Sequence, residues 1–311
     1  MKIAVFGSGG VGGYFGGRLA QAGEQVVFIA RGEHLDALRK QGLKVDSPKG
    51  DFHLKEVRAT DQPAEAGVMD VILLGVKAWQ VAEAARAMQP MVGPETFVVP
   101  LQNGVDAPDQ LAEALGKEHV LGGLCHISSH IAAPGYIRHV GIEPDIAFGE
   151  LDNHPSQRCQ VLKEAFERAG VKVMIPVDIH VAMWEKFLFI AAISSVGAVT
   201  RAPVGILRKL PETRALLEGA MREIMTVAQA SRIDLNEGHI SRTFVFIDNL
   251  PEGTRASMQR DILEGRPSEL AWQNGAVVRR GRERGVPTPI NEMIYAALLP
   301  QEMRARGEVS F

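Results

Sequence analysis

The pattern of hydrophobic and polar positions changes character along the chain. In the first half, short apolar runs typical of buried parallel strands cover residues 2–6, 25–30, 68–76 and 96–101. Amphipathic stretches after them predict helices at residues 14–22, 34–41, 79–88 and 108–115. Strands that alternate with helices in this way predict a parallel sheet with helices on both faces.

The pattern then becomes mixed and finally helical. Residues 43–54 predict a hairpin around Ser47-Pro48-Lys49-Gly50, residues 120–146 short β-like pieces, residues 157–169 a helix, and residues 172–176 a strand. Beyond Pro176, helical patterns cover residues 179–200, 211–231, 237–249, 254–263, 268–283 and 289–304. We therefore expect an α/β domain over residues 1–176 and an all-α domain over residues 177–311.

A glycine-rich motif lies directly after the first predicted strand and opens the first helix. Gly7 would permit the tight turn, Gly9 the approach of a pyrophosphate, and Gly12 close packing of the helix on the strand. The free N–H groups and the dipole at the helix start favour phosphate charge. The sequence predicts a dinucleotide site, rather than a merely structural turn, at Gly7, Ser8, Gly9, Gly10, Val11 and Gly12.

The end of the second strand indicates which dinucleotide. An NAD site usually carries Asp or Glu there to bind the ribose hydroxyls, whereas this strand ends in Ala30-Arg31. A guanidinium can bind a 2′-phosphate through its planar fork of donors, so we expect NADP(H). Glu33 is the alternative acidic residue, and Arg31 could also be a solvated charge at a strand end.

Two polar side chains follow later strands of the predicted sheet. Lys77 ends the run that covers residues 71–76, and Asn103 follows the strand at residues 96–101. Ligands of open α/β sheets bind outside the carboxyl ends of the strands. Lys77 could meet a carboxylate or phosphate and Asn103 the nicotinamide, although a lysine or a turn asparagine here could also be purely structural.

Composition excludes several classes of function. The 311 residues carry a formal net charge of -3, so we expect no nucleic-acid partner. Two cysteines form no disulfide framework and fit the cytoplasm. The apolar stretch at residues 187–200 is shorter than a membrane span, so we expect a buried helix and no membrane contact. Cys125, His126 and His130 are too few and too β-like to predict a metal site.

Taken together, these motifs resemble the ketopantoate reductase (2-dehydropantoate 2-reductase) family over nearly the whole chain. The N-terminal markers are the glycine loop, Arg31, Val76-Lys77-Ala78-Trp79-Gln80 and Gln102-Asn103-Gly104. The C-terminal markers are Trp184-Glu185-Lys186-Phe187, Ser257-Met258, Asp261, Gly265-Arg266 and Ser268-Glu269. The resemblance implies a Rossmann-type domain followed by an all-helical domain, with the active site in the cleft between them.

The resemblance also implies an activity and a set of roles. The family reduces the 2-keto acid ketopantoate to pantoate with NADPH, a step of pantothenate biosynthesis. Lys186 would then donate the proton to the substrate carbonyl, because an ammonium both stabilises charge developing on oxygen and can deliver a proton. Glu269 would lie near cofactor and substrate, Ser257 would bind the substrate carboxylate, and Lys77 and Asn103 would line the same site.

Three positions depart from the family pattern. Members typically carry asparagines four and eight residues after the lysine, where this chain has Ile190 and Ser194. A third asparagine, three residues before the serine, is replaced by Thr254. Ser194 and Thr254 can still hydrogen-bond a substrate, whereas Ile190 cannot. Such a loss is enough to change substrate preference.

Other functions therefore stay open beside ketopantoate reduction. One is a D-2-hydroxyacid dehydrogenase for another branched or aromatic 2-keto acid, which the more apolar Ile190 favours. Another is a non-catalytic NADP(H)-binding regulator, which the presence of Lys186 and Glu269 argues against. Arg279, Arg280, Arg282 and Arg284 are interpreted as the polar face of a helix. The resemblance and the apolar stretch at residues 187–200 are compatible with a homodimer.

Overall fold

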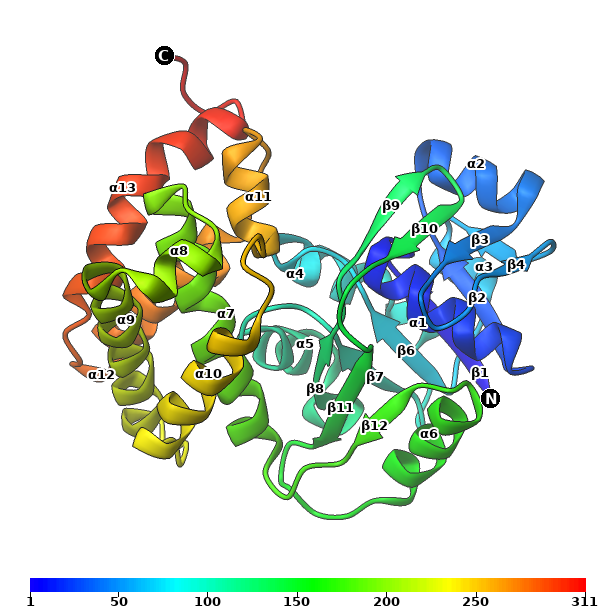
Figure 1. Cartoon of the computed structure of the whole chain (residues 1–311). Helices are drawn as coiled ribbons and strands as arrows, with labels where there is room; N and C mark the ends of the chain where they lie inside the picture. Colours follow the sequence, from blue (N-terminus) through cyan, green and yellow to red (C-terminus); the bar gives the residue numbers. More distant parts are fainter. The chain divides into compact units, whose positions relative to one another are not determined.

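The computed structural model describes residues 1–311. The chain forms two compact units, coloured along the sequence in Figure 1. The first comprises Met1–Gln102 and Ala107–Ile179, and the second comprises Asn103–Asp106 and His180–Phe311. The main division thus falls between residues 179 and 180, against an expected boundary at 176/177. The assignment of Asn103–Asp106 to the second unit is a feature that the hydrophobic pattern does not indicate.

The first unit contains all the strands. They are β1 (Lys2–Phe6), β2 (Gln25–Ile29), β3 (Leu43–Asp46), β4 (Phe52–Leu54), β5 (Arg58–Thr60), β6 (Val71–Leu74), β7 (Phe97–Pro100), β8 (Leu121–His126), β9 (Ser129–Ala133), β10 (Tyr136–His139), β11 (Asp145–Glu150) and β12 (Lys172–Met174). Its helices are α1 (Gly10–Gln21), α2 (Gly32–Gln41), α3 (Pro63–Ala66), α4 (Val81–Ala87), α5 (Ala107–Leu115) and α6 (Gln157–Arg168), with short 3₁₀ turns η1 (Ala78–Gln80), η2 (Gln89–Met91) and η3 (Lys117–His119).

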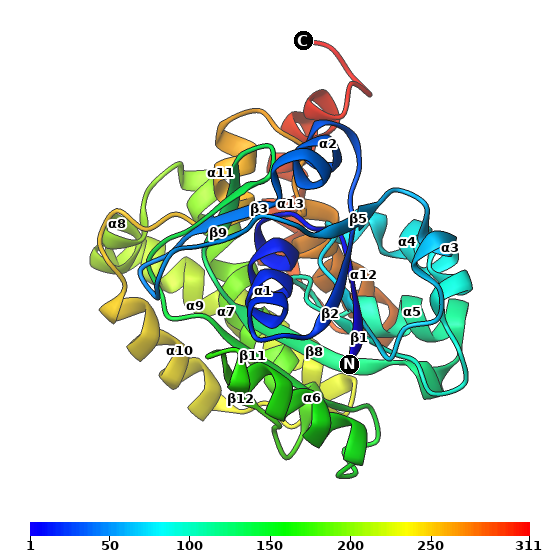
Figure 2. The ribbon, with the colours of Figure 1, turned by 90° about the vertical axis from the view of Figure 1, so that its right-hand side faces the viewer.

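The main sheet of the first unit is parallel throughout, as the alternation of strands and helices predicts. Its strand order is β5-β2-β1-β6-β7. Alternate residues of β1 enter different cores, because successive side chains of a strand point to opposite faces. Ile3 and Val5 pack with α1 and α6, whereas Ala4 and Phe6 pack with α4 and α5. Figure 2 shows α1 on one side of β1 and β2, and α4 and α5 on the other.

Two smaller sheets complete the first unit. One has the order β4-β3-β10-β9, and its β3–β4 pair is antiparallel, which confirms the predicted hairpin at residues 43–54. The other has the order β12-β11-β8. Strand β5 was not predicted, because its three residues, Arg58–Thr60, include only one apolar side chain. These sheets place the β9–β10 hairpin beside the N-terminal part of α1, where Gly10 packs against the backbone of Ser129.

The second unit is helical. Its helices are α7 (Ile179–Thr200), α8 (Val204–Lys209), α9 (Pro211–Ala230), α10 (Glu237–Asn249), α11 (Ser257–Leu263), α12 (Asn274–Arg284) and α13 (Pro289–Ala305), with the 3₁₀ turn η4 (Leu270–Trp272). The fold class is therefore a Rossmann-type parallel sheet unit followed by an all-α unit, as predicted. The short helix α8 was not expected.

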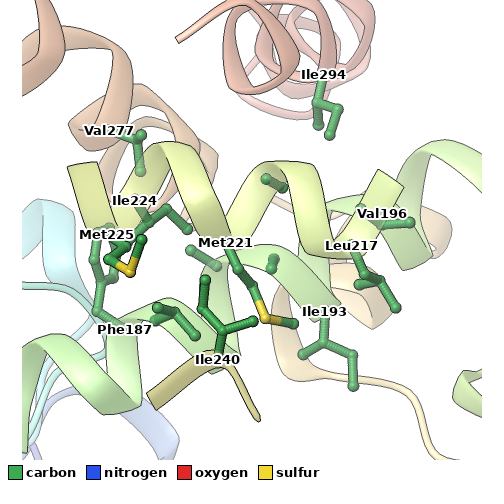
Figure 3. Close-up of a cluster of buried hydrophobic side chains, with 14 of the residues drawn as sticks. Phe187, Ile193, Val196, Leu217, Met221, Ile224, Met225, Ile240, Val277 and Ile294 are labelled. Carbon is green, nitrogen blue, oxygen red and sulfur yellow. The ribbon is translucent and has the colours of Figure 1, made fainter. Parts of the chain in front are cut away.

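Helix α7 is the central helix of the second unit. It is the one helix long and apolar enough to span a membrane, but 67% of its most apolar window is buried inside the protein. Phe187, Ile193 and Val196 of α7 pack with Leu217 and Met221 of α9 in the same core (Figure 3). The expectation of a buried helix at residues 187–200 is confirmed, because most of this stretch packs inside the second unit.

The expectation of one continuous helix over residues 268–283 is wrong. The 3₁₀ turn η4 ends at Trp272, and α12 begins at Asn274. Between them Gln273 has φ -102° and ψ -94°, outside the helical region. Just before η4, the Ser268 backbone N–H donates to the Glu302 carboxylate of α13 at 3.1 and 3.0 Å. This tertiary bond fixes the chain where the periodicity alone would continue a helix.

Candidate functional site

The glycine loop between β1 and α1 has the geometry that the motif requires. Gly7 has φ +94°, in the left-handed region that glycine adopts without strain. A Cβ on Gly12 would lie 2.2 Å from the Gly7 carbonyl oxygen, so only glycine allows α1 to pack this closely. A Cβ on Gly9 would meet no atom within 4 Å. The loop is thus closed by Gly7 and Gly12 and open at Gly9.

The rest of the loop is held by the end of β2. The Gly7 N–H and the Ser8 hydroxyl both donate to the Ile29 carbonyl, at 3.2 and 3.4 Å. Gly10 and Val11 begin α1, whose first turn contains no acidic side chain. Anions bind readily at a glycine loop that leads into a helix N-terminus, because the backbone N–H groups there are free to donate. The open side at Gly9 and the absence of acidic groups from the first turn fit a dinucleotide pyrophosphate.

Arg31 lies where the cofactor's adenosine ribose is expected, directly after β2. It is the N-cap residue of α2, and its side chain is 67% exposed. Arg31 Nη2 lies 3.2 Å from Glu83 Oε1 of α4, and Glu83 is 59% exposed. An ion pair this exposed contributes little to stability. Arg31 can therefore release Glu83 and bind a phosphate instead. Glu33, the alternative acidic residue, is also exposed in the first turn of α2.

Lys77 and Gln102 mark the ends of neighbouring strands. Lys77 follows β6, is exposed, and places its ammonium 5.7 Å from the ring centroid of Trp79. The buried Gln102 amide follows β7 and donates to the carbonyls of Leu74 and Val76, at 2.8 and 3.0 Å. Gln102 therefore ties the end of β7 to the end of β6. This bond fixes the backbone that leads into Lys77 and into Asn103.

The segment Asn103–Asp106 packs within the second unit. Asp106 accepts from Arg279 at 2.5 Å and from Arg280 at 2.8 Å, both on α12. The Arg280 Nη2 also lies 3.5 Å from the Val105 carbonyl oxygen. Gly104 has φ +119°, and a Cβ there would lie 3.2 Å from the Trp272 carbonyl oxygen. The turn that presents Asn103 is thus fixed by α12 and η4.

Arg280 was interpreted from the sequence as part of a solvated helix face, and the structure corrects this. Its side chain is 18% exposed, against 72% for Arg282 two residues later. Beside its contacts to the Asn103–Asp106 segment, its guanidinium lies 5.9 Å from the ring centroid of Trp184 on α7. Arg280 therefore links the turn that carries Asn103 to the part of α7 that carries Lys186.

Lys186 occupies the first half of α7. It is half-buried and lies in the chain between Trp184 and Phe187, whose rings pack edge to face with centroids 5.6 Å apart. Ile190 and Ser194 follow at spacings of four, so all three lie along one face of α7. Ser194 is fully buried, and its hydroxyl oxygen has no hydrogen-bond partner in the protein. Ile190 is half-buried and places an apolar side chain between these two polar positions.

Glu269 lies at the start of η4 in a segment anchored to α13. It is 5% exposed, and its carbonyl accepts from the N–H groups of Trp272 and Gln273 at 3.0 and 2.9 Å. The neighbouring Ser268 is bound by Glu302, which also accepts from Arg306 at 2.6 Å. Glu269 is therefore the N-cap residue of a 3₁₀ turn rather than a residue inside the first turn of a long helix.

Ser257 begins α11, and Thr254 lies three residues before it. Both side chains are half-buried. The Thr254 carbonyl accepts from the Val204 N–H at 3.0 Å. Gln259 fixes α11 to the end of α7, because its amide donates to the carbonyls of Gly197 and Ala202 at 2.9 and 2.8 Å.

The predicted residues divide between the two units. The glycine loop, Arg31 and Lys77 belong to the first unit, whereas Asn103, Lys186, Ser194, Thr254, Ser257 and Glu269 belong to the second. Their assigned roles stay predictions. Cys125, His126 and His130 form no ligand cluster: His126 Nδ1 lies 2.8 Å from Asp145, and no group of three metal-ligating side chains is present.

The chain matches two models of one protein family. Residues 3–153 match the model described as ketopantoate reductase PanE/ApbA, and residues 178–302 match its C-terminal model. An uncharacterized oxidoreductase, YkpB of Bacillus subtilis (strain 168), is 30% identical over 298 residues, which cover 96% of this chain and 98% of that protein.

Solved structures share the fold over nearly the whole chain. The crystal structure of 2-dehydropantoate 2-reductase from Geobacter metallireducens GS-15 has a TM-score of 0.90 and 31% identity, and covers 96% of this chain and 99% of that chain. A D-mandelate dehydrogenase solved with NADH and anilino(oxo)acetate has a TM-score of 0.89 at 22% identity, over 98% of this chain and 100% of that chain. At that identity the likeness shows the fold alone.

Proposed function

This chain belongs to the ketopantoate reductase family, and on that premise we propose that it reduces a 2-keto acid to the 2-hydroxy acid with NADPH. The default substrate is ketopantoate, which would place the enzyme in pantothenate biosynthesis. The observation that carries the proposal is the glycine loop, which is open only at Gly9, in a chain that also keeps Lys186 and Glu269.

The residues of the first unit would hold the cofactor. The glycine loop binds the pyrophosphate through its backbone N–H groups, and Arg31 binds the 2′-phosphate in place of Glu83. The reduced nicotinamide, when bound, supplies a hydride to the carbonyl carbon. The fold itself does not select NADPH, because the D-mandelate dehydrogenase with this fold was solved with NADH. The preference for NADPH therefore rests on Arg31.

The residues of the second unit would act on the substrate. Negative charge develops on the carbonyl oxygen during reduction, and the Lys186 ammonium stabilises it and delivers the proton. The half-buried position of Lys186 beside Trp184 and Phe187 strengthens this attraction, since charges interact more strongly where water is excluded. Ser257 donates to the substrate carboxylate. Asn103 and Glu269 orient the reacting groups from two segments that the protein holds firmly.

The proposed role of Lys186 is tested with Lys186→Ala. We expect kcat to fall at least about 100-fold, while the Kd for NADPH changes little, because the substitution removes proton delivery and leaves the glycine loop intact. Lys163→Ala is the matched control, since Lys163 pairs with Glu167 on the surface of α6. An unchanged kcat in Lys186→Ala would refute the assigned role. A wild-type protein that binds NADPH but turns over no 2-keto acid would instead favour a non-catalytic NADP(H)-binding regulator.

A second substrate class is favoured by Ile190. This side chain lies on the face of α7 that carries Lys186, where an apolar residue suits a branched or aromatic 2-keto acid. A panel of 2-keto acids is compared by kcat/KM, with NADPH and NADH absorbance as the readout. If kcat/KM is highest for ketopantoate by a wide margin, the second substrate class is excluded. If kcat/KM is highest for an apolar 2-keto acid by a wide margin, the second substrate class is established. Ile190→Asn is then expected to shift the ratio toward ketopantoate by about tenfold, whereas Ile190→Val leaves it unchanged.

We propose a cytoplasmic location, which the buried cysteines Cys125 and Cys159 support, since they form no disulfide. The small-molecule substrate is the one partner that the proposal requires. A homodimer is proposed only by analogy with the family.

A further inference from the structure

His34 contacts the glycine loop and the β9–β10 hairpin at the same time. It lies near the start of α2, three residues after Arg31, and is half-buried. Its Nε2 lies 2.9 Å from the Ser8 carbonyl oxygen. Its Nδ1 accepts from the Gly135 N–H at 3.1 Å. Gly135 forms the turn between β9 and β10.

The two partners determine the state of the ring. A carbonyl oxygen only accepts, so the Nε2 that faces Ser8 must carry a hydrogen. A backbone N–H only donates, so the Nδ1 that faces Gly135 must be without one. Both bonds form together only in the neutral Nε2–H tautomer. A protonated ring would place two donors, Nδ1–H and the Gly135 N–H, against each other.

The bond to Ser8 sets the direction of a donor in the loop. The peptide group between Ser8 and Gly9 is planar and trans, so its carbonyl and its N–H point in opposite directions. When the Ser8 carbonyl is held against His34, the Gly9 N–H points away from His34. A Cβ on Gly9 would meet no atom within 4 Å, so the surroundings of this residue are open.

The hairpin side of the contact is equally constrained. Gly135 has φ +72°, and its carbonyl accepts from the Lys44 N–H at 2.9 Å. A Cβ on Gly10 would lie 2.5 Å from the Ser129 carbonyl oxygen at the start of β9. The hairpin therefore abuts the loop at Gly10 and reaches it again through His34. His34 is thus connected on both sides to backbone that cannot easily move.

We infer that His34, as the neutral Nε2–H tautomer, is a positioning residue that orients the Ser8–Gly9 peptide for the cofactor's pyrophosphate. The inference rests on the proposed dinucleotide site at the glycine loop. His34 does not touch the cofactor in this account. It acts through the Ser8 carbonyl, and it makes the β9–β10 hairpin part of the cofactor-binding apparatus.

Cofactor binding by two variants tests the inference. Kd for NADPH is measured by fluorescence titration, and Kd for NADP⁺ by calorimetry, in wild type, His34→Leu and His34→Gln. We expect His34→Leu to raise both Kd values at least about tenfold, which corresponds to about 1.4 kcal/mol, because the Ser8–Gly9 peptide is then no longer held in one orientation. We expect His34→Gln to stay within about threefold of wild type, because the glutamine amide N–H can reach the Ser8 carbonyl. His53→Gln is the control, since His53 is an exposed histidine of the same unit that binds the Gln41 carbonyl.

The pH dependence of Kd for the cofactor is a second readout, which a merely structural role of His34 would not change. Burial lowers the pKa of His34, and the hydrogen bond to the Ser8 carbonyl opposes that shift. Binding should therefore weaken as the pH falls below about 6.5 in wild type and in His53→Gln, and should weaken less in His34→Gln. The 2′-phosphate of the cofactor titrates in all three proteins, so only the difference between them is assigned to His34. The glycine loop contributes no titratable group. Those on the elements packed around His34 are the N-cap residue Arg31, then Glu33, Asp36, Arg39 and Lys40 of α2, His130 of β9, and Tyr136, Arg138 and His139 of β10.

The outcomes separate this inference from the proposed function. If wild type binds neither NADPH nor NADH, the dinucleotide site itself is refuted. If wild type binds but His34→Leu binds equally well, only the role of His34 is refuted. Equal losses in His34→Leu and His34→Gln, with identical pH profiles, would also refute it, because neither rescue by the amide nor titration of the ring would then be seen.

Discussion

Individual glycines of the nucleotide loop have separable tasks. The motif predicts close packing at Gly12 and close cofactor approach at Gly9, and the structure gives each a measurable counterpart. A Cβ on Gly12 would lie 2.2 Å from the Gly7 carbonyl oxygen. A Cβ on Gly9 would meet no atom within 4 Å, and Gly9 has an ordinary φ of -70°. One glycine is therefore required by the fold and the other by what the loop binds.

Alanine substitutions at these two positions should separate folding from binding. Gly9→Ala should leave the melting temperature within about 1 °C of wild type, because its methyl group meets no protein atom. It should raise Kd for NADPH at least about tenfold, because the methyl group occupies space that the pyrophosphate needs. Gly12→Ala should lower the free energy of unfolding by about 1–3 kcal/mol through overpacking. Thermal melts and fluorescence titrations measure both; a Gly9→Ala protein with unchanged affinity would contradict the assignment of this loop.

The sequence predicts some single residues well and others poorly for a physical reason. A glycine loop after a strand is a local feature, so its position and its neighbours follow from a few consecutive residues. His34 and Arg280 gain their meaning from partners distant in sequence, Gly135 at 101 positions and Asp106 at 174. A lone histidine or arginine on an amphipathic helix carries no signal of such a partner.

Secondary-structure elements follow the hydrophobic pattern where they are long and apolar, and depart from it where tertiary bonds decide. The β1–α1–β2 unit and the long helix α7 were predicted because apolar or glycine-rich runs mark them in the sequence. The break at Gln273 was not predicted, because it depends on the Ser268 contact with Glu302 of a later helix. The short strand β5 and the short helix α8 were missed because three to six residues carry too little periodicity.

Helix α12 should affect the turn that carries Asn103 through the Asp106 ion pairs. Asp106 is 13% exposed and Arg280 is 18% exposed, so removing either partner leaves a partly buried charge without its hydrogen bonds. Asp106→Asn and Arg280→Met should each lower the free energy of unfolding by about 1.5–3 kcal/mol. Each should also lower kcat/KM about tenfold, because Asn103 is no longer held in one position.

The matched control for α12 is Arg282→Met. Arg282 is 72% exposed and lies 3.4 Å from Glu292, so its loss should change neither stability nor kcat/KM measurably. Denaturant unfolding and steady-state kinetics provide the two readouts. If Asp106→Asn lowered stability but left kcat/KM at the wild-type value, the ion pairs would be structural only, and the placement of Asn103 in the site would have to be abandoned.

At the scale of the whole molecule, two units with different architectures are joined in one chain. The first unit packs apolar side chains on both faces of a parallel sheet, and the second is built around the apolar helix α7. The hydrophobic pattern predicts this change of class because strands and helices have different periods. It does not predict that Asn103–Asp106 packs with the helical unit, since that depends on the ion pairs to α12.

The two units should respond differently to acid. Burial raises the pKa of Glu24, but hydrogen bonds from the amino terminus and Arg168 outweigh it, so the pKa lies below its ordinary 4.5. Burial favours a higher pKa for Glu150 as well, but the hydrogen bonds from Arg158 and Ser156 outweigh burial. The pKa of Glu150 therefore also lies below its ordinary 4.5. A carboxyl whose pKa is lowered by folding stabilises the fold fully above 4.5, and this stability is lost as the pH falls through the folded value.

These two carboxylates belong to the first unit and are only 8% and 13% exposed. In the second unit, the hydrogen bond from Arg214 lowers the pKa of Asp248, but this carboxyl is 44% exposed and solvent screens the pair. Hydrogen exchange at pH 7 and pH 4 should therefore show a larger loss of protection in peptides of the first unit. Glu150→Gln should be less stable than wild type at pH 7 and should lose less on acidification, because the ionisation linked to folding is gone. Equal losses of protection in both units would show instead that acid acts on the molecule as a whole, and that these buried carboxylates do not control it.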